Sequence, residues 1–311
     1  MNWILFAFLG AMFQAVESAI KKKALQTKGM NNVVAFVAYL TAGISFALMY
    51  FLKDGTLLSA NNLSGTFWGS LAFLVVLNII GVWFAYKALD LAELSYLMPF
   101  MTLTSLSLII PPMILLGEFP SRTSLLGIVV VVIGAISMEW KRGKHLSLED
   151  LERNKNNRKG VLFFLGTALC YTFTPALAKV TIVESGSVLF ASYVTHLLMA
   201  MGFVLWIFFM PIVERKKESL KIIMQNLTGS GARNFLLASI FAGIAIAISN
   251  GAINYALQFE SVSSVFAIKR TMPLFAFMIG VFYFKEKRNL KQKIVATLIM
   301  VAGAIIITFS K

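Results

Sequence analysis

The sequence predicts an all-α, polytopic membrane protein with ten transmembrane helices, arranged as two inverted five-helix repeats. Three observations predict this fold. The chain of 311 residues is 58% hydrophobic and has a mean hydropathy of +0.79, whereas soluble domains are about 45–50% apolar. Ten apolar segments are long enough to cross a bilayer, which takes about 20 residues. Landmark residues also recur at a fixed spacing in the two halves of the chain.

The apolar segments are expected to be helices, because a backbone that crosses lipid must satisfy its own hydrogen bonds. In chain order they are residues 3–20, 32–52, 67–89, 91–116, 124–140, 160–180, 187–212, 235–257, 262–284 and 294–309. The first segment has no basic stretch before it, which favours a retained helix over a cleaved signal. Cys170 is the only cysteine, so an intrachain disulfide or a cysteine metal site is excluded and a packing role is expected.

The basic residues are distributed very unevenly between the loops. Of the 28 lysines and arginines, 22 follow odd-numbered helices and four lie on the opposite side; the last two are Lys269 and Arg270. Basic loops mark the cytoplasmic face, so the bias places both chain termini outside. The net charge of +14 therefore indicates membrane orientation and contact with anionic lipid rather than nucleic-acid binding.

An internal repeat divides the chain at a basic linker, residues 141–159. The first repeat is 1–140 and the second 160–311. Leu89 precedes Glu118 by 29 residues, and Leu257 precedes Glu286 by the same 29. Looser matches pair Gly10 with Gly166, Lys23 with Lys179, and Gly134-Ala135 with Gly303-Ala304. Five helices per repeat force the second repeat to run inverted through the membrane, as in many secondary transporters.

Two helix-end motifs carry a family resemblance. They are Leu115-Leu116-Gly117-Glu118 and Phe284-Lys285-Glu286, each followed by a polar turn and an apolar helix rich in Gly and Ala. With the ten helices and the repeat, they make the chain resemble the drug/metabolite transporter superfamily in its ten-helix, EamA-type form. The resemblance covers nearly the whole chain and implies that the first four helices of each half surround a central cavity. It also implies that both termini are cytoplasmic, opposite to the charge bias.

Lys269 and Arg270 are the most informative residues, because they lie inside the apolar segment 262–284. A charge at mid-membrane costs about 2.5–3.5 kcal/mol on insertion scales. Their repeat counterparts are Met101 and Thr102, so the fold alone does not require the pair. We expect the two cations to line a polar cavity and bind an anion. The alternative is a structural cluster, or pairing with a glutamate of another helix.

A ninth-helix Lys-Arg pair is also similar to that of the plastid sugar-phosphate translocators, where it binds phosphate. Those proteins add a lysine on the fourth helix, and residues 91–116 contain no basic residue here. The departure puts a doubly charged phosphate in doubt. It leaves a carboxylate, a singly charged head group or a weaker phosphate site open.

Four further polar residues are candidates for substrate binding. Tyr193 and His196 are three residues apart in the seventh helix, and Asn250 and Asn254 are four apart in the eighth, so each pair shares a helix face. A histidine in a membrane can relay protons, and asparagines can bind substrate. Internal packing and hydrogen bonding between helices are the alternatives.

Glu17, near the end of the first helix, is the candidate for a coupling proton or cation. Its alternative is a salt bridge to Lys21, four residues further on. Proline has a mechanical role: Pro273, three residues after Arg270, frees a carbonyl near Lys269 and favours local unwinding beside the basic pair.

The sequence carries no enzyme signature. Gly229-Ser230-Gly231 lacks the lysine of a phosphate-binding loop, and no two histidines have metal-binding spacing. We therefore expect no cofactor and no metal. The function expected is secondary transport of small anionic or zwitterionic organic metabolites across the cell membrane by alternating access, as an exporter or exchanger. Partners would be the substrate and the lipid bilayer, with no nucleic acid; a homodimer is compatible with the sequence. A flippase of a lipid-linked phosphate carrier is the alternative, and a non-transporting scaffold the third.

Overall fold

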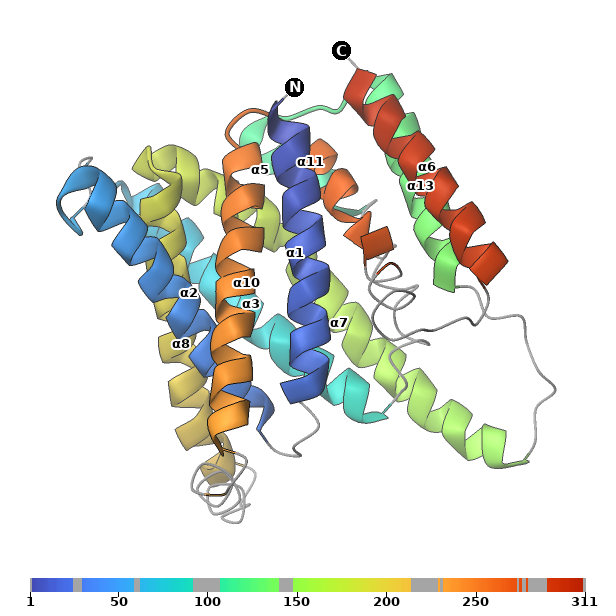
Figure 1. The fold of residues 1–311 in the computed structure, drawn as a ribbon, viewed down its shortest axis with the longest axis horizontal. Helices are drawn as coiled ribbons and strands as arrows, with labels where there is room; N and C mark the ends of the chain where they lie inside the picture. Colours follow the sequence, from blue (N-terminus) through green and yellow to red (C-terminus); the bar gives the residue numbers. More distant parts are fainter. Residues whose placement is uncertain are drawn as a thin grey trace.

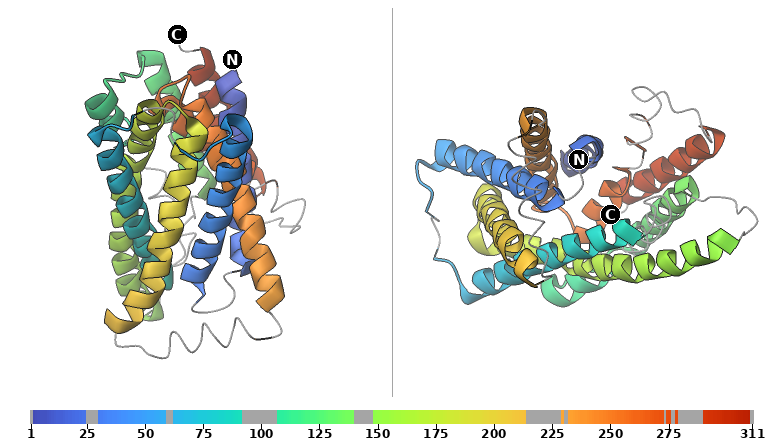
Figure 2. Two further views of the ribbon diagram at one scale, coloured as in Figure 1. Left: turned by 90° about the vertical axis from the view of Figure 1, so that its left-hand side faces the viewer. Right: turned by 90° about the horizontal axis from the view of Figure 1, so that it is seen from below.

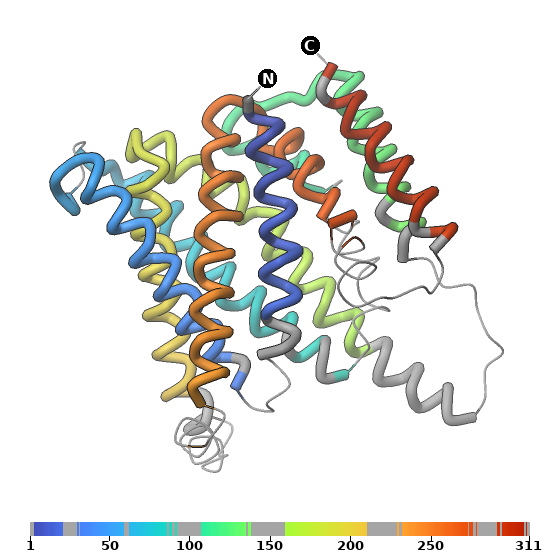
Figure 3. The backbone as a smooth tube through the Cα atoms, viewed as in Figure 1, coloured from blue at the N-terminus to red at the C-terminus, as the bar shows by residue number. Residues whose placement is uncertain are grey.

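The computed structural model describes residues 2–24, 30–58, 62–91, 107–139, 148–213, 229, 232–272, 274–275, 278 and 290–309 (Figures 1 and 3). These residues form helices joined by short turns, and no strand occurs among them. The helices are α1 (Asn2–Ala24), α2 (Asn31–Asp54), α3 (Gly65–Leu91), α5 (Ile110–Leu116), α6 (Arg122–Glu139), α7 (Leu148–Ser185), α8 (Val188–Val213), α10 (Ala232–Ala256), α11 (Val262–Lys269) and α13 (Leu290–Phe309). The all-α prediction is confirmed.

Six helices are long and apolar enough to cross a membrane: α1, α2, α3, α7, α8 and α10. The apolar stretches of α6 and α13, Arg122–Gly134 and Ile294–Ile307, are shorter. Residues 92–106 of the predicted fourth helix lie outside the described residues, and so do 273, 276–277 and 279–284 of the predicted ninth; α5 and α11 are the helices described in these two segments. Large apolar side chains such as Leu52, Phe209 and Phe309 are exposed on the outer surface, as lipid contact requires.

One boundary differs clearly from the prediction. Helix α7 begins at Leu148, twelve residues before the predicted start at Gly160. Residues 148–159, which were predicted to belong to the linker, are therefore helical. The prediction was based on apolar length, so it placed the start of the helix after the charged residues. A helix can extend past the bilayer into water, because its backbone hydrogen bonds are internal in both environments.

The helices pack in a pattern with two-fold pseudosymmetry. The closest pairs are α1 with α10, α3 with α7, α2 with α8, and α6 with α13. In the repeat, α7 and α10 are the counterparts of α1 and α3, so the pair α1–α10 corresponds to the pair α3–α7. The pairs α2–α8 and α6–α13 each consist of a helix and its own counterpart. In Figure 1, α1 and α3 run downward whereas their repeat counterparts α7 and α10 run upward. The second five-helix repeat is therefore inverted relative to the first.

Small residues allow the symmetric pairs to approach closely. Ser249 donates a hydrogen bond to the carbonyl of Gly10 at 2.8 Å, between α10 and α1. Thr167 donates to the carbonyl of Gly81 at 3.2 Å, between α7 and α3. A Cβ on Gly10 would lie 2.5 Å from the side chain of Ile253 and 3.1 Å from the carbonyl oxygen of Ser249, so a larger residue there must displace the Ile253 side chain.

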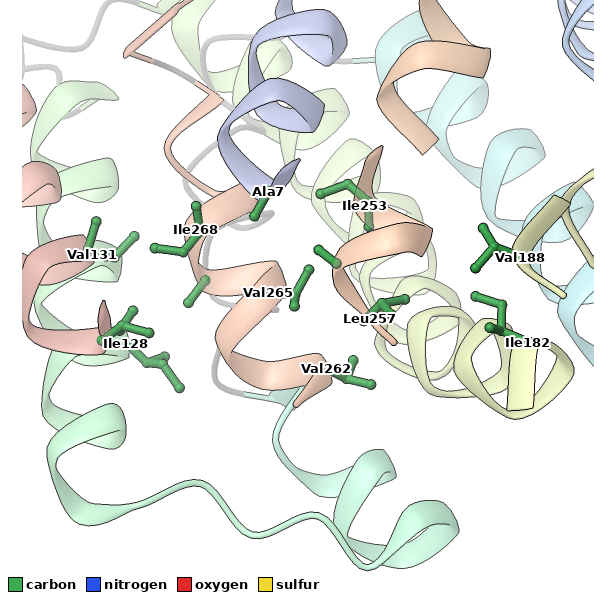
Figure 4. Close-up of a cluster of buried hydrophobic side chains, with 14 of the residues drawn as sticks. Ala7, Ile128, Val131, Ile182, Val188, Ile253, Leu257, Val262, Val265 and Ile268 are labelled. Carbon is green, nitrogen blue, oxygen red and sulfur yellow. The ribbon is translucent and has the colours of Figure 1, made fainter. Parts of the chain in front are cut away.

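Helix α11 packs in the middle of the molecule. It contacts α1, α6, α7, α10 and α13, and its apolar side joins the largest buried cluster (Figure 4). In this cluster Ile268 and Val265 lie close to Ala7 of α1, and Val131 of α6 lies on the other side. The paired helices α6 and α13 stand at one side of the bundle in two views (Figures 1 and 2). Lys269 is the last residue of this central helix, and Arg270 follows it.

Candidate functional site

The basic pair lies where α11 ends. Ser261 caps the start of the helix by accepting a hydrogen bond from the backbone N–H of Ser264, and Arg270 is the residue that closes its other end. The helix is thus only eight residues long, and it ends beside the predicted point of unwinding. Pro273 itself lies outside the described residues. A helix C-terminus carries partial negative charge, which favours lysine and arginine at this position.

The side chains of Lys269 and Arg270 are partly buried inside the helical bundle. The ammonium group of Lys269 lies over the ring of Phe266, one turn earlier, at 4.9 Å from the ring centroid. Such a contact stabilises a desolvated cation by about 2 kcal/mol or less. That is less than the cost of placing two adjacent positive charges in a bundle. A nearby negative charge is needed to offset the remainder.

Glu17 on α1 supplies a negative charge close to this site. Its carboxyl group lies within electrostatic range of Lys269 and His196. The alternative salt bridge between Glu17 and Lys21 stays a prediction, because the side chain of Lys21 lies outside the described residues.

His196 joins α8 to α10 through a defined hydrogen-bond network. Its Nδ1 is 2.7 Å from the carbonyl oxygen of Ser192, and its Nε2 is 3.0 Å from Nδ2 of Asn250. The carbonyl can only accept, so Nδ1 carries a proton and Nε2 accepts from the amide. This arrangement fixes the orientation of the imidazole ring between α8 and α10. The ring is buried and packs against Tyr39 and Phe46 of α2, at 5.9 and 5.1 Å between ring centroids.

Asn254 extends the same network one turn along α10. Its Nδ2 donates to the hydroxyl of Ser192 at 3.0 Å. Both asparagines therefore point at α8, as their four-residue spacing predicts. Tyr193 differs: its hydroxyl donates to the carbonyl of Leu57, beyond the end of α2, and its ring packs with Phe190. The structure thus groups His196, Asn250 and Asn254. The Tyr193 hydroxyl instead lies at the turn that follows α2.

Sequence reasoning missed three residues of this region: Ser192, Tyr39 and Phe46. Ser192 was detectable, because it lies four residues before His196 and so on the same helix face. Tyr39 and Phe46 are aromatic residues in an apolar run, and nothing in the run separates them from core residues. Cys170 is buried on α7 next to Gly81 of α3, in the packing position predicted for it.

Removing the amide of Asn250 tests the strength of this network. Asn250→Leu leaves the Nε2 acceptor of buried His196 without its partner, which costs about 1–3 kcal/mol. We expect a lower unfolding temperature of the purified protein in detergent. Asn78→Leu is the matched control, because Asn78 donates to the carbonyl of Leu74 of its own helix and has no other partner among the described residues. Equal destabilisation by the two substitutions would contradict a network between α8 and α10.

Glu118, predicted to be structural, lies two residues after the end of α5 and belongs to a second polar cluster. Gly117 adopts φ +65° in the left-handed region and turns the chain at the helix end. Glu118 then forms a salt bridge with Lys179 of α7 and accepts a hydrogen bond at 2.8 Å from the backbone N–H of Val262, at the start of α11. Lys179 also donates to the carbonyl of Glu260 at 2.6 Å. The repeat counterpart Glu286 lies outside the described residues.

Inverted five-helix repeats, membrane-length helices and charged residues on a central broken helix define a multi-pass membrane transporter. The chain belongs to the EamA-like transporter family, whose model matches residues 1–139 and 158–309. It is therefore a membrane transporter of the drug/metabolite transporter superfamily, a family of transporters rather than enzymes.

Solved structures agree with this fold. One of them, reported only as a crystal structure of a protein, superposes with a TM-score of 0.73 at 14% sequence identity. The match covers 98% of this chain and 96% of that chain. No curated protein matches the chain in a sequence comparison.

Proposed function

We propose that the protein is a secondary transporter of small organic anions or zwitterions, working by alternating access in the cell membrane. The observation that carries the proposal is the pair Lys269 and Arg270 at the end of a central helix that contacts both halves of the bundle. Cations that lie inside a membrane bundle typically mark a substrate or ion pathway.

The roles follow from the chemistry of the side chains. Arg270 is a planar donor suited to bidentate binding of a carboxylate or phosphate, and Lys269 acts as a point charge. Asn250 and His196 would orient the substrate through the amide and imidazole that already join α8 to α10. Tyr193 remains a weaker candidate, because its hydroxyl is engaged with Leu57.

Glu17 would balance the pair when no substrate is bound. Its carboxyl group lies within electrostatic range of Lys269, so an arriving anion would compete with it for the same cation. An amino acid or other zwitterion could instead satisfy both charges at once, with its anionic group on Arg270 and its ammonium group on Glu17. Glu17 would then be the residue that couples transport to a proton or another cation.

Counterflow in proteoliposomes tests this function. Vesicles are preloaded with one solute of a panel of dicarboxylates, α-amino acids and phosphate monoesters, and uptake of the same labelled solute is followed. We expect counterflow for at least one anion or zwitterion, and none with the Lys269→Ala/Arg270→Ala variant. Counterflow that persists unchanged in this variant contradicts the proposed role of the pair. Movement of a lipid-linked phosphate in its place would favour the flippase.

A further inference from the structure

A single carboxylate joins the two repeats at the start of α11. Glu118 follows α5 and belongs to the first repeat, whereas α11 belongs to the second. One oxygen of Glu118 accepts the hydrogen bond from the backbone N–H of Val262 at 2.8 Å, and the other binds the ammonium group of Lys179. The side chains of Lys179 and Glu118 are only 13% and 18% exposed. A charged acceptor in such surroundings makes a stronger hydrogen bond than a neutral one.

The first turn of α11 is held by two caps that come from different repeats. Val262 is the first residue of the helix, so its N–H has no acceptor within the helix. Glu118 supplies that acceptor, and its charge also favours the positive end of the helix dipole. Ser261 takes the N–H of Ser264 instead. The hydroxyl of Ser264 also lies 3.2 Å from that of Ser124 on α6, which is a second hydrogen bond to the first repeat.

The position of the basic pair follows from the position of this first turn. Helix α11 runs from Val262 to Lys269, and Arg270 closes it. Its two ends are therefore about 10 Å apart along a short, stiff rod. A slip of one residue would move each cation by about 1.5 Å along the axis and turn it by about 100°. In enzymes a misplacement of only about 1 Å can lower the rate 100-fold.

We propose that Glu118 is a positioning residue: by holding the first N–H of α11, it fixes where Lys269 and Arg270 stand. Lys179 keeps the carboxylate in place, and its ammonium group also donates to the carbonyl of Glu260, two residues before the helix. Glu118 acts through the helix and not by contact with a substrate. The inference rests on the proposed function, because that function gives the two cations their role as an anion site.

Val262→Pro removes the hydrogen bond without removing a charge. Proline has no N–H and is tolerated at the first position of a helix. The residue before a proline must be extended, and Ser261 already has φ −62° and ψ 146°. The ion pair of Glu118 with Lys179 stays intact. Val262→Ala is the matched control, because it loses buried side-chain volume at the same position but keeps the N–H.

The place of α11 is measured without a substrate by disulfide cross-linking of the full-length protein in membranes. In a Cys170→Ser background, Ala7→Cys is combined with either Val265→Cys or Ile268→Cys. Both positions on α11 lie close to Ala7 of α1 (Figure 4). The ratio of the two cross-link yields reports where α11 stands along α1. In parallel, equilibrium binding of succinate, glutamate and inorganic phosphate is measured on the variants without added cysteines.

We expect Val262→Pro to change the ratio of cross-link yields, because a sliding helix moves the two α11 positions unequally relative to Ala7. The affinity for the anion that binds wild type should fall by about tenfold. Glu118→Leu, which removes the acceptor, should do the same. Val262→Ala and Glu118→Gln keep a donor and an acceptor, so both should stay close to wild type in the two measurements. Should Val262→Pro fail to fold, Glu118→Leu compared with Glu118→Gln decides the same question.

The inference is wrong if Val262→Pro and Glu118→Leu remain folded and match their controls in cross-link ratio or in affinity, since the contact is then a helix cap alone. The proposed function fails in a different way. If the cross-link ratio shifts as expected while none of the three anions binds wild type, Glu118 still positions α11, but the two cations at its end are not an anion site.

Discussion

Replacing Arg270 by alanine is expected to lower the affinity for a substrate anion by about 10- to 100-fold. The estimate corresponds to the loss of one charge-assisted hydrogen bond, worth about 1.5–3 kcal/mol. Lys269→Ala should have a similar effect, since the two cations follow one another at the end of α11. The affinity is measured by equilibrium binding of a labelled anion to the purified protein.

Lys53→Ala is the control for this prediction. Lys53 is a cation in the last turn of α2, and it is exposed, so its loss changes net charge equally without touching the site. Both site variants should remain folded, because each removes one of two adjacent like charges and leaves the other cation in place. Loss of folding together with loss of binding would instead indicate a structural ion pair.

Gly243→Leu is expected to destabilise the protein by about 3 kcal/mol, the upper end of the usual cost of overpacking. Gly243 lies where α10 crosses α2, and a Cβ there would be 2.6 Å from the carbonyl oxygen of Ala38 and 2.6 Å from Cβ of Thr41. A backbone atom cannot move aside as a side chain can, so the two helices must separate. Thermal unfolding in detergent measures the effect.

Gly69→Leu is the matched control on α3. A Cβ at Gly69 meets nothing within 4 Å, and leucine forms helices better than glycine by somewhat under 1 kcal/mol. This variant should therefore be neutral or slightly more stable. If Gly243→Leu is as stable as Gly69→Leu, the close approach of α2 and α10 is incorrect.

The sequence predicted the helices well because membrane spans have a strong local signal. Apolar length locates α2 and α8 to within two residues at each end, and the inverted repeat anticipated their antiparallel course. The start of α7 was missed, since its first residues are charged and carry no membrane signal. Properties encoded locally were thus predictable.

The site was predictable only in part. Lys269 and Arg270 stand out because charge is rare in a span, and Asn250 with Asn254 because their spacing fixes a shared face. Tyr193 and His196 share a face as well, yet the tyrosine hydroxyl reaches Leu57 while the imidazole turns to Asn250. Spacing fixes the shared helix face but not the partner that each side chain reaches. The contact of Glu118 with Lys179 needs the folded juxtaposition of two repeats, which no short segment encodes.

Thermal stabilisation by ligands tests the central claim most directly, that Lys269 and Arg270 form an anion site. Wild type, Arg270→Ala and Lys53→Ala are unfolded with a panel of anionic, zwitterionic and cationic metabolites. A ligand that binds only the folded state raises the apparent stability by mass action, by about 2.7 kcal/mol at 100 times its Kd. We predict that an anion or zwitterion stabilises wild type and Lys53→Ala but not Arg270→Ala. Stabilisation by cations or lipids alone, or equal stabilisation of Arg270→Ala, would contradict the claim.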